Sequence, residues 1–173
     1  MNLPPPTTVY RDLARKQIEA ARTYTVGLLA GLDEADWFRQ PAEGVSHIAW
    51  QIGHLAMAEY GLCLFRMRGR APVDRDLMSG AFRKQFVRGS VPEPDPAKNP
   101  APQQIRAVLD RVHQQALTEM AEYAAALLEE PGEDPRAVFD TKLGALFFCP
   151  HHEMLHAGQI GLLRRLLGKP PIH

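Results

Sequence analysis

The chain has 173 residues, enough for one domain with a real hydrophobic core and too few for two comfortable ones. Its 20 basic and 20 acidic residues cancel, which argues against a nucleic-acid backbone or an anionic membrane as partner. No apolar run has the length of a membrane span, the N-terminus lacks signal-peptide features, and the 2 cysteines are typical of a reducing compartment. We therefore expect one cytoplasmic domain over residues 1–173, with a Pro-rich extension over residues 1–9.

The first half of the chain predicts two long helices. Thr7 or Thr8 can cap a helix from about Tyr10 to Leu32, in which apolar residues keep helical spacing. Ser46 is a suitable N-cap for a second helix, from about His47 to Arg68. This second helix is apolar on nearly every side, so we expect it to be buried among its neighbours.

The second half predicts a long loop and two more helices. The prolines near the end of residues 69–102 cannot continue a helix, and the whole stretch is predicted to be a loop that sets specificity. The third helix is expected from Gln103 to Leu128. A helical turn over residues 141–148 then leads to Pro150, which is expected at the first position of a last helix from His151 to Leu167. Gly168 ends it. No stretch alternates with period two, so the prediction is an all-α four-helix bundle with a long crossover loop.

Three histidines predict a metal site. His152 and His156 are four residues apart on the last helix, so their side chains lie on one face about 6 Å apart along the axis. His54 lies in the buried second helix and is the candidate third ligand. Taken singly, His54 is typical of a core histidine and the pair of a solvated face, but together they favour one shared divalent cation. Three imidazoles leave a coordination position open, as in catalytic zinc sites.

The run from His152 to His156 also matches the H-E-x-x-H motif of zinc proteases. Those enzymes take their third ligand from downstream, whereas residues 157–172 contain no Asp, Glu or His. A protease is therefore disfavoured. Of the other histidines, His151 lies about 100° from His152 around the helix and is expected outside the site. His47 is expected to be a helix-start residue rather than a partner of the ligands, and His113 and His173 receive no role.

Polar neighbours of the three histidines are the candidate catalytic residues. Glu153 is either a general base or an acidic residue favoured by the dipole in the first turn of its helix. Glu59 either orients a ligand imidazole or pairs with an arginine. Gln159 lies within about 20° of His152 and is a candidate polar group at the site. Cys149 is either a thiolate ligand or a small core residue.

Two blocks of sequence resemble the DinB/YfiT-like superfamily of four-helix metalloproteins. The first block is Trp37 to Pro41 ahead of Gly44 and Ser46, followed by Ile48-Ala49-Trp50-Gln51-Ile52-Gly53-His54-Leu55. The second block is His152-Glu153-Met154-Leu155-His156-Ala157-Gly158-Gln159-Ile160, closing with Leu166-Leu167-Gly168. The blocks cover both helices that carry the histidines, and through their order and spacing nearly the whole chain.

The resemblance implies that His54, His152 and His156 bind a metal, zinc first and nickel as the alternative. It further implies a homodimer and, by analogy with some members, a thiol S-transferase that joins a low-molecular-weight thiol such as bacillithiol or mycothiol to a small-molecule substrate. One alternative is a metal-dependent hydrolase, for which Glu153 or Glu59 would be the base. Another is a non-enzymatic bundle with a fourth ligand such as Cys149 or Gln159. The arginines of the predicted loop, Arg70, Arg75, Arg83 and Arg88, are interpreted as exposed rather than as an anion site.

Overall fold

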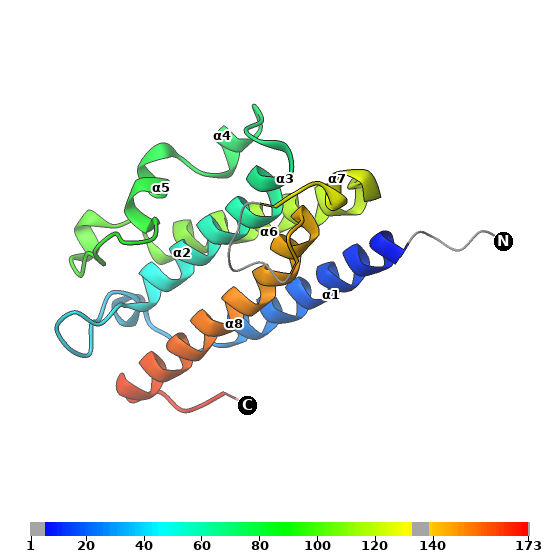
Figure 1. Cartoon of the computed structure of the whole chain (residues 1–173). Coiled ribbons are helices and arrows are strands. Elements are labelled where there is room, and N and C mark those ends of the chain that lie inside the picture. The colour runs from blue at the N-terminus through cyan, green and yellow to red at the C-terminus, as the bar shows by residue number, and fades with distance from the viewer. Residues whose placement is uncertain (1–5, 133–138, 173) are drawn as a thin grey trace.

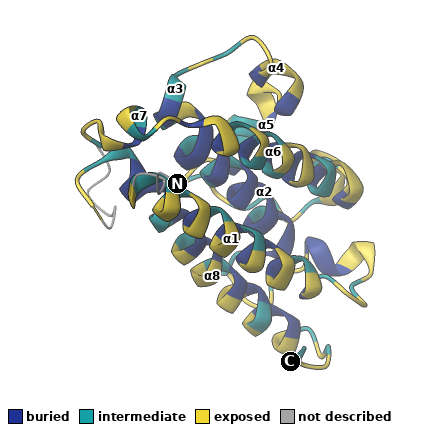
Figure 2. Cartoon of the chain, turned by 90° about the vertical axis from the view of Figure 1, so that its right-hand side faces the viewer, coloured by how far each residue is buried: buried dark blue, intermediate teal, exposed yellow. Residues whose placement is uncertain are grey.

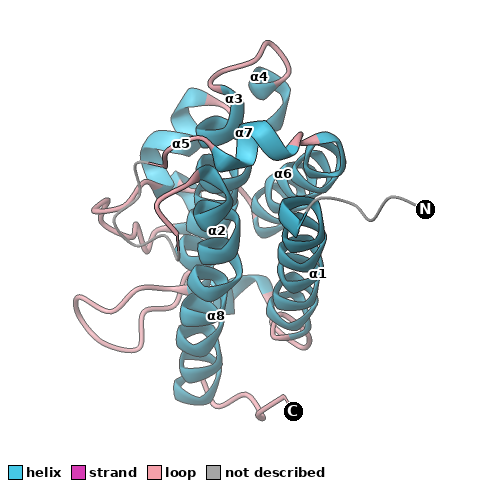
Figure 3. Cartoon of the chain, turned by 45° about the vertical axis from the view of Figure 1, so that its right-hand side comes forward, coloured by secondary structure: helices cyan, strands magenta, loops and turns pink. Residues whose placement is uncertain are grey.

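The computed structural model describes residues 6–132 and 139–172, and within these ranges every element is helical (Figure 3). The all-α prediction is therefore confirmed. Residues 1–5 of the predicted extension lie outside the described residues. The long elements are α1 (Pro6–Gly27), α2 (Ile48–Glu59), α6 (Pro102–Glu122) and α8 (Lys142–Leu166). The short ones are η1 (Glu34–Trp37), η2 (Tyr60–Phe65), α3 (Arg66–Arg68), α4 (Asp74–Leu77), α5 (Gly80–Phe86), η3 (Pro96–Lys98) and α7 (Ala125–Glu129).

The second predicted helix is one continuous rod made of α2, a π-helical turn (η2) and α3 (Figure 1). A π-helical turn widens the helix locally and is frequent at functional sites. The rod ends at Arg68, as predicted. Its N-cap is His47 and not Ser46, because His47 Nδ1 accepts a hydrogen bond from the Trp50 N–H at 3.1 Å.

Helices α1 and α8 both begin earlier than predicted. Helix α1 begins at Pro6, so neither threonine caps it and residues 6–9 are helical; proline suits this first turn because its missing N–H would have no helical partner there. Helix α8 begins at Lys142, and Pro150 lies inside it rather than at its start. An interior proline removes one helical hydrogen bond. Pro150 is itself buried, so the packing of α8 offsets that loss.

The predicted loop over residues 69–102 contains two short helices, which corrects the prediction. Residues 74–86 hold no proline, and Ser79 Oγ caps α5 by accepting the Phe82 N–H at 3.1 Å. The later prolines do prevent a long helix, because only the single turn η3 forms among them. The third predicted helix is also divided, since Tyr123 and Ala124 adopt extended backbone between α6 and α7.

Helix α8 lies along α1, and the α2 rod lies along α6 (Figure 1). The faces turned towards each other are buried and the outer faces exposed (Figure 2). Residues such as Ile18 on α1, Ile52 on α2, Leu109 on α6 and Ile160 on α8 have 0% of their surface exposed and form the core between the helices. None of the helices in the described ranges has both the length and the apolar character that crossing a membrane demands.

Gly53 lets α5 approach the buried rod. A Cβ at this position would lie 2.5 Å from the ring of Phe86, which is itself fully buried and packed against Phe82. We expect Gly53→Ala to lower the free energy of unfolding by about 1–3 kcal/mol through overpacking, although alanine in a helix normally gains about 1 kcal/mol. Urea denaturation measures the change. The matched control is Gly161→Ala on α8, where a Cβ meets open space and the free energy of unfolding is expected to rise. A higher free energy of unfolding in both variants would contradict the close packing of Gly53 against Phe86.

Candidate metal centre

The structure brings the three predicted histidines together. His54 extends from α2, and His152 and His156 extend from successive turns of α8. One ring nitrogen from each lies within 4.8 Å of the other two. Zn–N bonds of about 2.0–2.1 Å in a tetrahedral site separate the nitrogens by about 3.3 Å, so modest ring rotations fit all three to one ion. No cysteine, aspartate, glutamate or further histidine of the described residues joins this group.

Hydrogen bonds fix the orientation of two of the rings. His54 Nδ1 lies 3.0 Å from the carbonyl oxygen of Phe86, and His156 Nδ1 lies 2.5 Å from Gln51 Oε1. Both partners are acceptors, so each Nδ1 carries the proton and each Nε2 carries the lone pair. The Gln51 amide is in turn fixed by donating from Nε2 to Gln159 Oε1 at 2.8 Å. Metal-binding histidines are generally held in this way.

Burial keeps the His156 imidazole uncharged. The surrounding protein desolvates His156, and the neighbouring His152 and His54 add repulsion, which together lower the pKa of His156 to about 3. Its imidazole is therefore neutral across the physiological range. A metal ion requires neutral imidazole ligands, so no proton has to be displaced from His156 when an ion binds.

Aromatic rings cover the cluster. Trp50 stacks on His54 with ring centroids 4.8 Å apart and planes 5° from parallel, and its Nε1 donates to Ser90 Oγ at 2.9 Å. Phe148 packs against His152 at 5.7 Å. These rings restrict water around the histidines and so strengthen electrostatic interactions there.

The Trp50 stack predicts an optical signal for metal binding. Trp50 and Trp37 are the 2 tryptophans of the chain. In a Trp37→Phe variant we expect Ni²⁺ or Co²⁺ to quench the remaining fluorescence in a saturable titration, because an open-shell ion beside His54 accepts energy from the stacked indole. Equal quenching in a Trp37→Phe/His54→Ala variant would contradict binding at this cluster.

The two candidate carboxylates lie in a separate buried network. Arg22 Nε donates to Glu153 Oε1 at 2.8 Å, and Arg22 Nη2 donates to Glu59 Oε2 at 2.8 Å. Glu59 also contacts His113 Nδ1 at 2.8 Å. The structure thus favours the arginine-pairing interpretation of Glu59. The first-turn interpretation of Glu153 was wrong, since α8 begins at Lys142 and Glu153 is a mid-helix residue with 2% of its surface exposed.

The remaining histidines of the described residues and Cys149 lie outside the three-histidine cluster. His47 caps α2, as expected of a helix-start residue, and His151 is exposed on α8. His113, which was assigned no role, holds Glu59. Cys149 is buried, and its hydrogen bond with Cys63 together with desolvation raises its thiol pKa well above the usual value. It is thus a protonated core residue, which disfavours the thiolate interpretation.

Sequence reasoning missed Trp50, Gln51 and Phe86 as supports of the cluster. A signal existed for two of them, because Trp50 and Gln51 precede His54 by four and three residues and so share its side of the helix. Gln51 was also one of few polar residues in an apolar helix. Phe86 contributes only its backbone carbonyl, for which a sequence carries no signal.

The fold and the cluster define an all-α protein whose histidine group is compatible with a divalent metal ion. Comparison with family models agrees: the DinB superfamily model matches residues 17–160, that is 144 of the 173 residues. The chain belongs to the DinB superfamily. A comparison with curated proteins finds no match.

Proposed function

We propose that His54, His152 and His156 bind one divalent metal ion, zinc first and nickel as the alternative. The observation that supports this most is the convergence of three ring nitrogens, one from each histidine, within 4.8 Å beside the stacked ring of Trp50. The hydrogen bonds to Phe86 and Gln51 support Nε2 as the ligand atom of His54 and His156.

We further propose that the protein is a metal-dependent S-transferase that uses a low-molecular-weight thiol and a small electrophilic substrate. A divalent ion lowers the pKa of a thiol or water in its open coordination position and yields a nucleophile at neutral pH. The chain's own contribution is to hold the three rings and to restrict water through Trp50 and Phe148. Within residues 6–132 and 139–172, no fourth histidine, cysteine or carboxylate joins the three rings. The DinB superfamily match supports this class only by analogy with some members of the superfamily.

Two observations weigh against the alternatives. A hydrolase needs a general base close to the metal-bound water, whereas Glu59 and Glu153 are both committed to Arg22. A purely structural ion would favour a fourth protein ligand, whereas Cys149 is hydrogen-bonded to Cys63 and Gln159 to Gln51. The cytoplasmic location and the homodimer remain proposals, the first supported by two free cysteines and the second by the family resemblance.

The test compares metal-free and reconstituted protein with bacillithiol, mycothiol or glutathione and an alkyl halide. In the reaction the thiolate sulfur forms a bond to carbon, halide leaves, and the thiol proton goes to solvent. We expect thiol consumption only in the reconstituted protein and its loss in His152→Ala, with His151→Ala as the unaffected control. A fully reconstituted protein that turns over none of these thiols would contradict the transferase and favour a non-enzymatic metal protein.

Gln51 is expected to tune the affinity of the site. Replacing it by leucine removes the acceptor for His156 Nδ1, and loss of such a supporting hydrogen bond typically weakens metal binding by about 10–100-fold. Competition against a chromogenic chelator measures the affinity. The control is Gln115→Leu on α6, where the amide bonds Glu119 instead; equal affinities in the two variants would show that Gln51 does not support the site.

A further inference from the structure

A second polar site lies where the π-helical turn meets α4 and α5. A pocket of about 490 Å³ opens there, lined by ten residues that include Tyr60, Asp74, Arg70, Arg75 and Arg83. This volume is within the usual range for small-molecule sites. None of the three clustered histidines lines it, so the pocket and the candidate metal centre are separate places.

The side chains of the three arginines of this pocket form no ion pair or hydrogen bond with any residue of the described ranges. Arg70 and Arg75 are exposed, whereas Arg83 is half-buried. The Arg83 guanidinium lies over the Tyr60 ring, 5.4 Å from its centroid, and its Nε is buried with no acceptor. A buried N–H of a charged group costs free energy when it has no acceptor. An oxyanion bound in the pocket would supply the acceptor that Arg83 Nε lacks.

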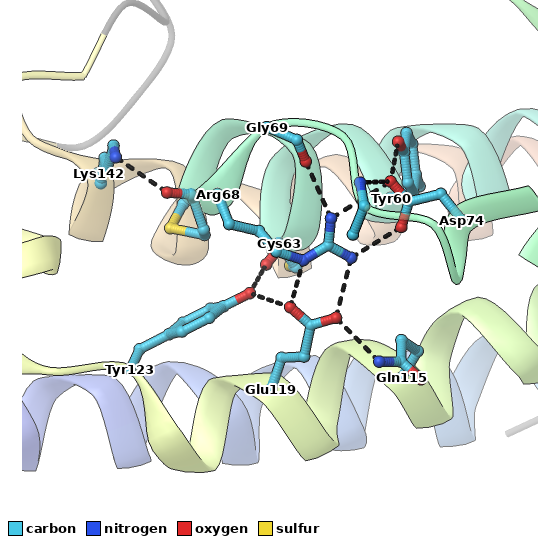
Figure 4. Close-up of polar contacts among 11 residues, drawn as sticks. Tyr60, Cys63, Arg68, Gly69, Asp74, Gln115, Glu119, Tyr123 and Lys142 are labelled. Atoms are coloured by element: carbon cyan, nitrogen blue, oxygen red, sulfur yellow. Dashed lines mark hydrogen bonds and ion pairs between the residues drawn. The ribbon is translucent and has the colours of Figure 1, made fainter.

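Asp74 is the carboxylate among the lining residues, and its charge is compensated elsewhere. Arg68 Nη2 donates to Asp74 Oδ1 at 2.8 Å, while the Tyr60 hydroxyl and the Ala71 N–H donate to Oδ2, each at 2.8 Å (Figure 4). Arg68 also bonds Glu119 on α6, which fixes the whole network in place. Asp74 therefore does not neutralise Arg70, Arg75 or Arg83, and the pocket keeps an excess of positive charge.

We infer that this pocket binds the oxyanion group, phosphate or carboxylate, of a small molecule. The planar guanidinium fork matches both groups, and several arginines around one cavity are the usual means of holding them. The interpretation of the loop arginines as exposed holds for Arg70, Arg75 and Arg88, whereas Arg83 is half-buried. The cavity nevertheless gathers Arg70, Arg75 from α4 and Arg83 from α5. Helix α5 also joins the two sites, since it carries Arg83 at its middle and Phe86, whose carbonyl oxygen contacts His54 Nδ1, at its end.

The test is calorimetric titration of the full-length protein at fixed ionic strength with two probes, inorganic pyrophosphate and tricarballylate. We expect saturable binding that weakens about tenfold or more in Arg83→Gln and in Arg75→Gln, because each removes a charged hydrogen-bond donor. Arg165→Gln, an exposed arginine on α8 outside the pocket, is the control of equal charge change and is expected to stay within about twofold of the wild type. The probe that binds more tightly identifies the oxyanion.

Three results would overturn the inference: no binding of either probe at millimolar concentration, wild-type affinity in both pocket variants, or loss of binding in His156→Ala. The last result would place the anion on a metal ion at the histidine cluster. Retained binding in His156→Ala supports the pocket whether or not the metal proposal holds, so the two proposals fail separately. If Arg83→Gln does not fold, Arg75→Gln carries the test, since that side chain is exposed.

Discussion

Replacing Arg22 by methionine is expected to lower the free energy of unfolding by about 3–5 kcal/mol, because it leaves two buried carboxylates without their cation. Arg22 bonds both Glu59 and Glu153, and the exposed fractions of the three side chains are 5%, 1% and 2%. Arg22 Nη1 also donates to the Leu109 carbonyl at 3.3 Å, so the network ties α1 to α2, α6 and α8. Urea denaturation at neutral pH measures the loss.

The control is Arg15→Met on the same helix. Arg15 forms a surface i, i+4 pair with Glu19 at 3.3 Å, in which Arg15 is half-buried, and such helix pairs contribute about 0.3–0.5 kcal/mol. A loss below about 1 kcal/mol in Arg22→Met would mean that water or protonation compensates the two carboxylates, and that the buried network does not hold the helices together.

The same network determines the response to acid. Burial raises the pKa of Glu59, but the charge of Arg22 and the contact with His113 lower it more, so the net pKa lies below its ordinary 4.5. A carboxyl group with a lowered pKa stabilises the folded protein above its unfolded-state pKa, and this stability disappears as the pH falls through the folded-state pKa. In Arg22→Met burial prevails, the pKa of Glu59 rises, and the sign reverses. The free energies of unfolding of the wild type and of Arg22→Met should thus converge as the pH is lowered from 7 towards 4. A difference between the two free energies that does not change with pH would contradict this account.

Saturating zinc is expected to stabilise the wild-type protein by about 2.7 kcal/mol at a free concentration 100 times the dissociation constant, since the ion binds the folded chain. The stabilisation requires His54, on α2, and His152 and His156, on α8, because the three nitrogens are brought together only when these helices pack. In His152→Ala we expect most of it to disappear, because two imidazoles bind far more weakly than three.

The control for this prediction is the neighbouring His151→Ala. His151 is exposed on α8 and lies outside the cluster, so zinc should stabilise this variant as it does the wild type. Thermal or urea unfolding with and without zinc measures the stabilisation of the His151→Ala and His152→Ala variants. Equal stabilisation of the His151 and His152 variants would mean that zinc binds elsewhere on the surface.

The features that depend on local sequence pattern could be predicted from the sequence. Helical spacing and proline positions predicted the long helices, and the four-residue spacing of His152 and His156 put both on one face of α8. The third histidine followed from a different kind of evidence, because His54 was a polar residue in an otherwise apolar, buried helix.

The rest depends on contacts between distant segments, which a single sequence does not display. Arg22 and Glu153 are 131 positions apart, and nothing local to either indicates the pair. The carbonyl of Phe86 reaches His54 only because α5 forms and packs at Gly53. Pro150 was misplaced because a buried proline within α8 has the same local signal as one at a helix start.

The central claim is that His54, His152 and His156 hold one metal ion. The most direct measurement is metal content by mass spectrometry on tag-free protein, for the wild type beside His54→Ala, His156→Ala and the control His151→Ala. We predict about one zinc or nickel ion per chain in the wild type and the control, and its loss in both cluster variants. A wild-type protein that holds no metal even after reconstitution, or cluster variants that keep it, would contradict the claim.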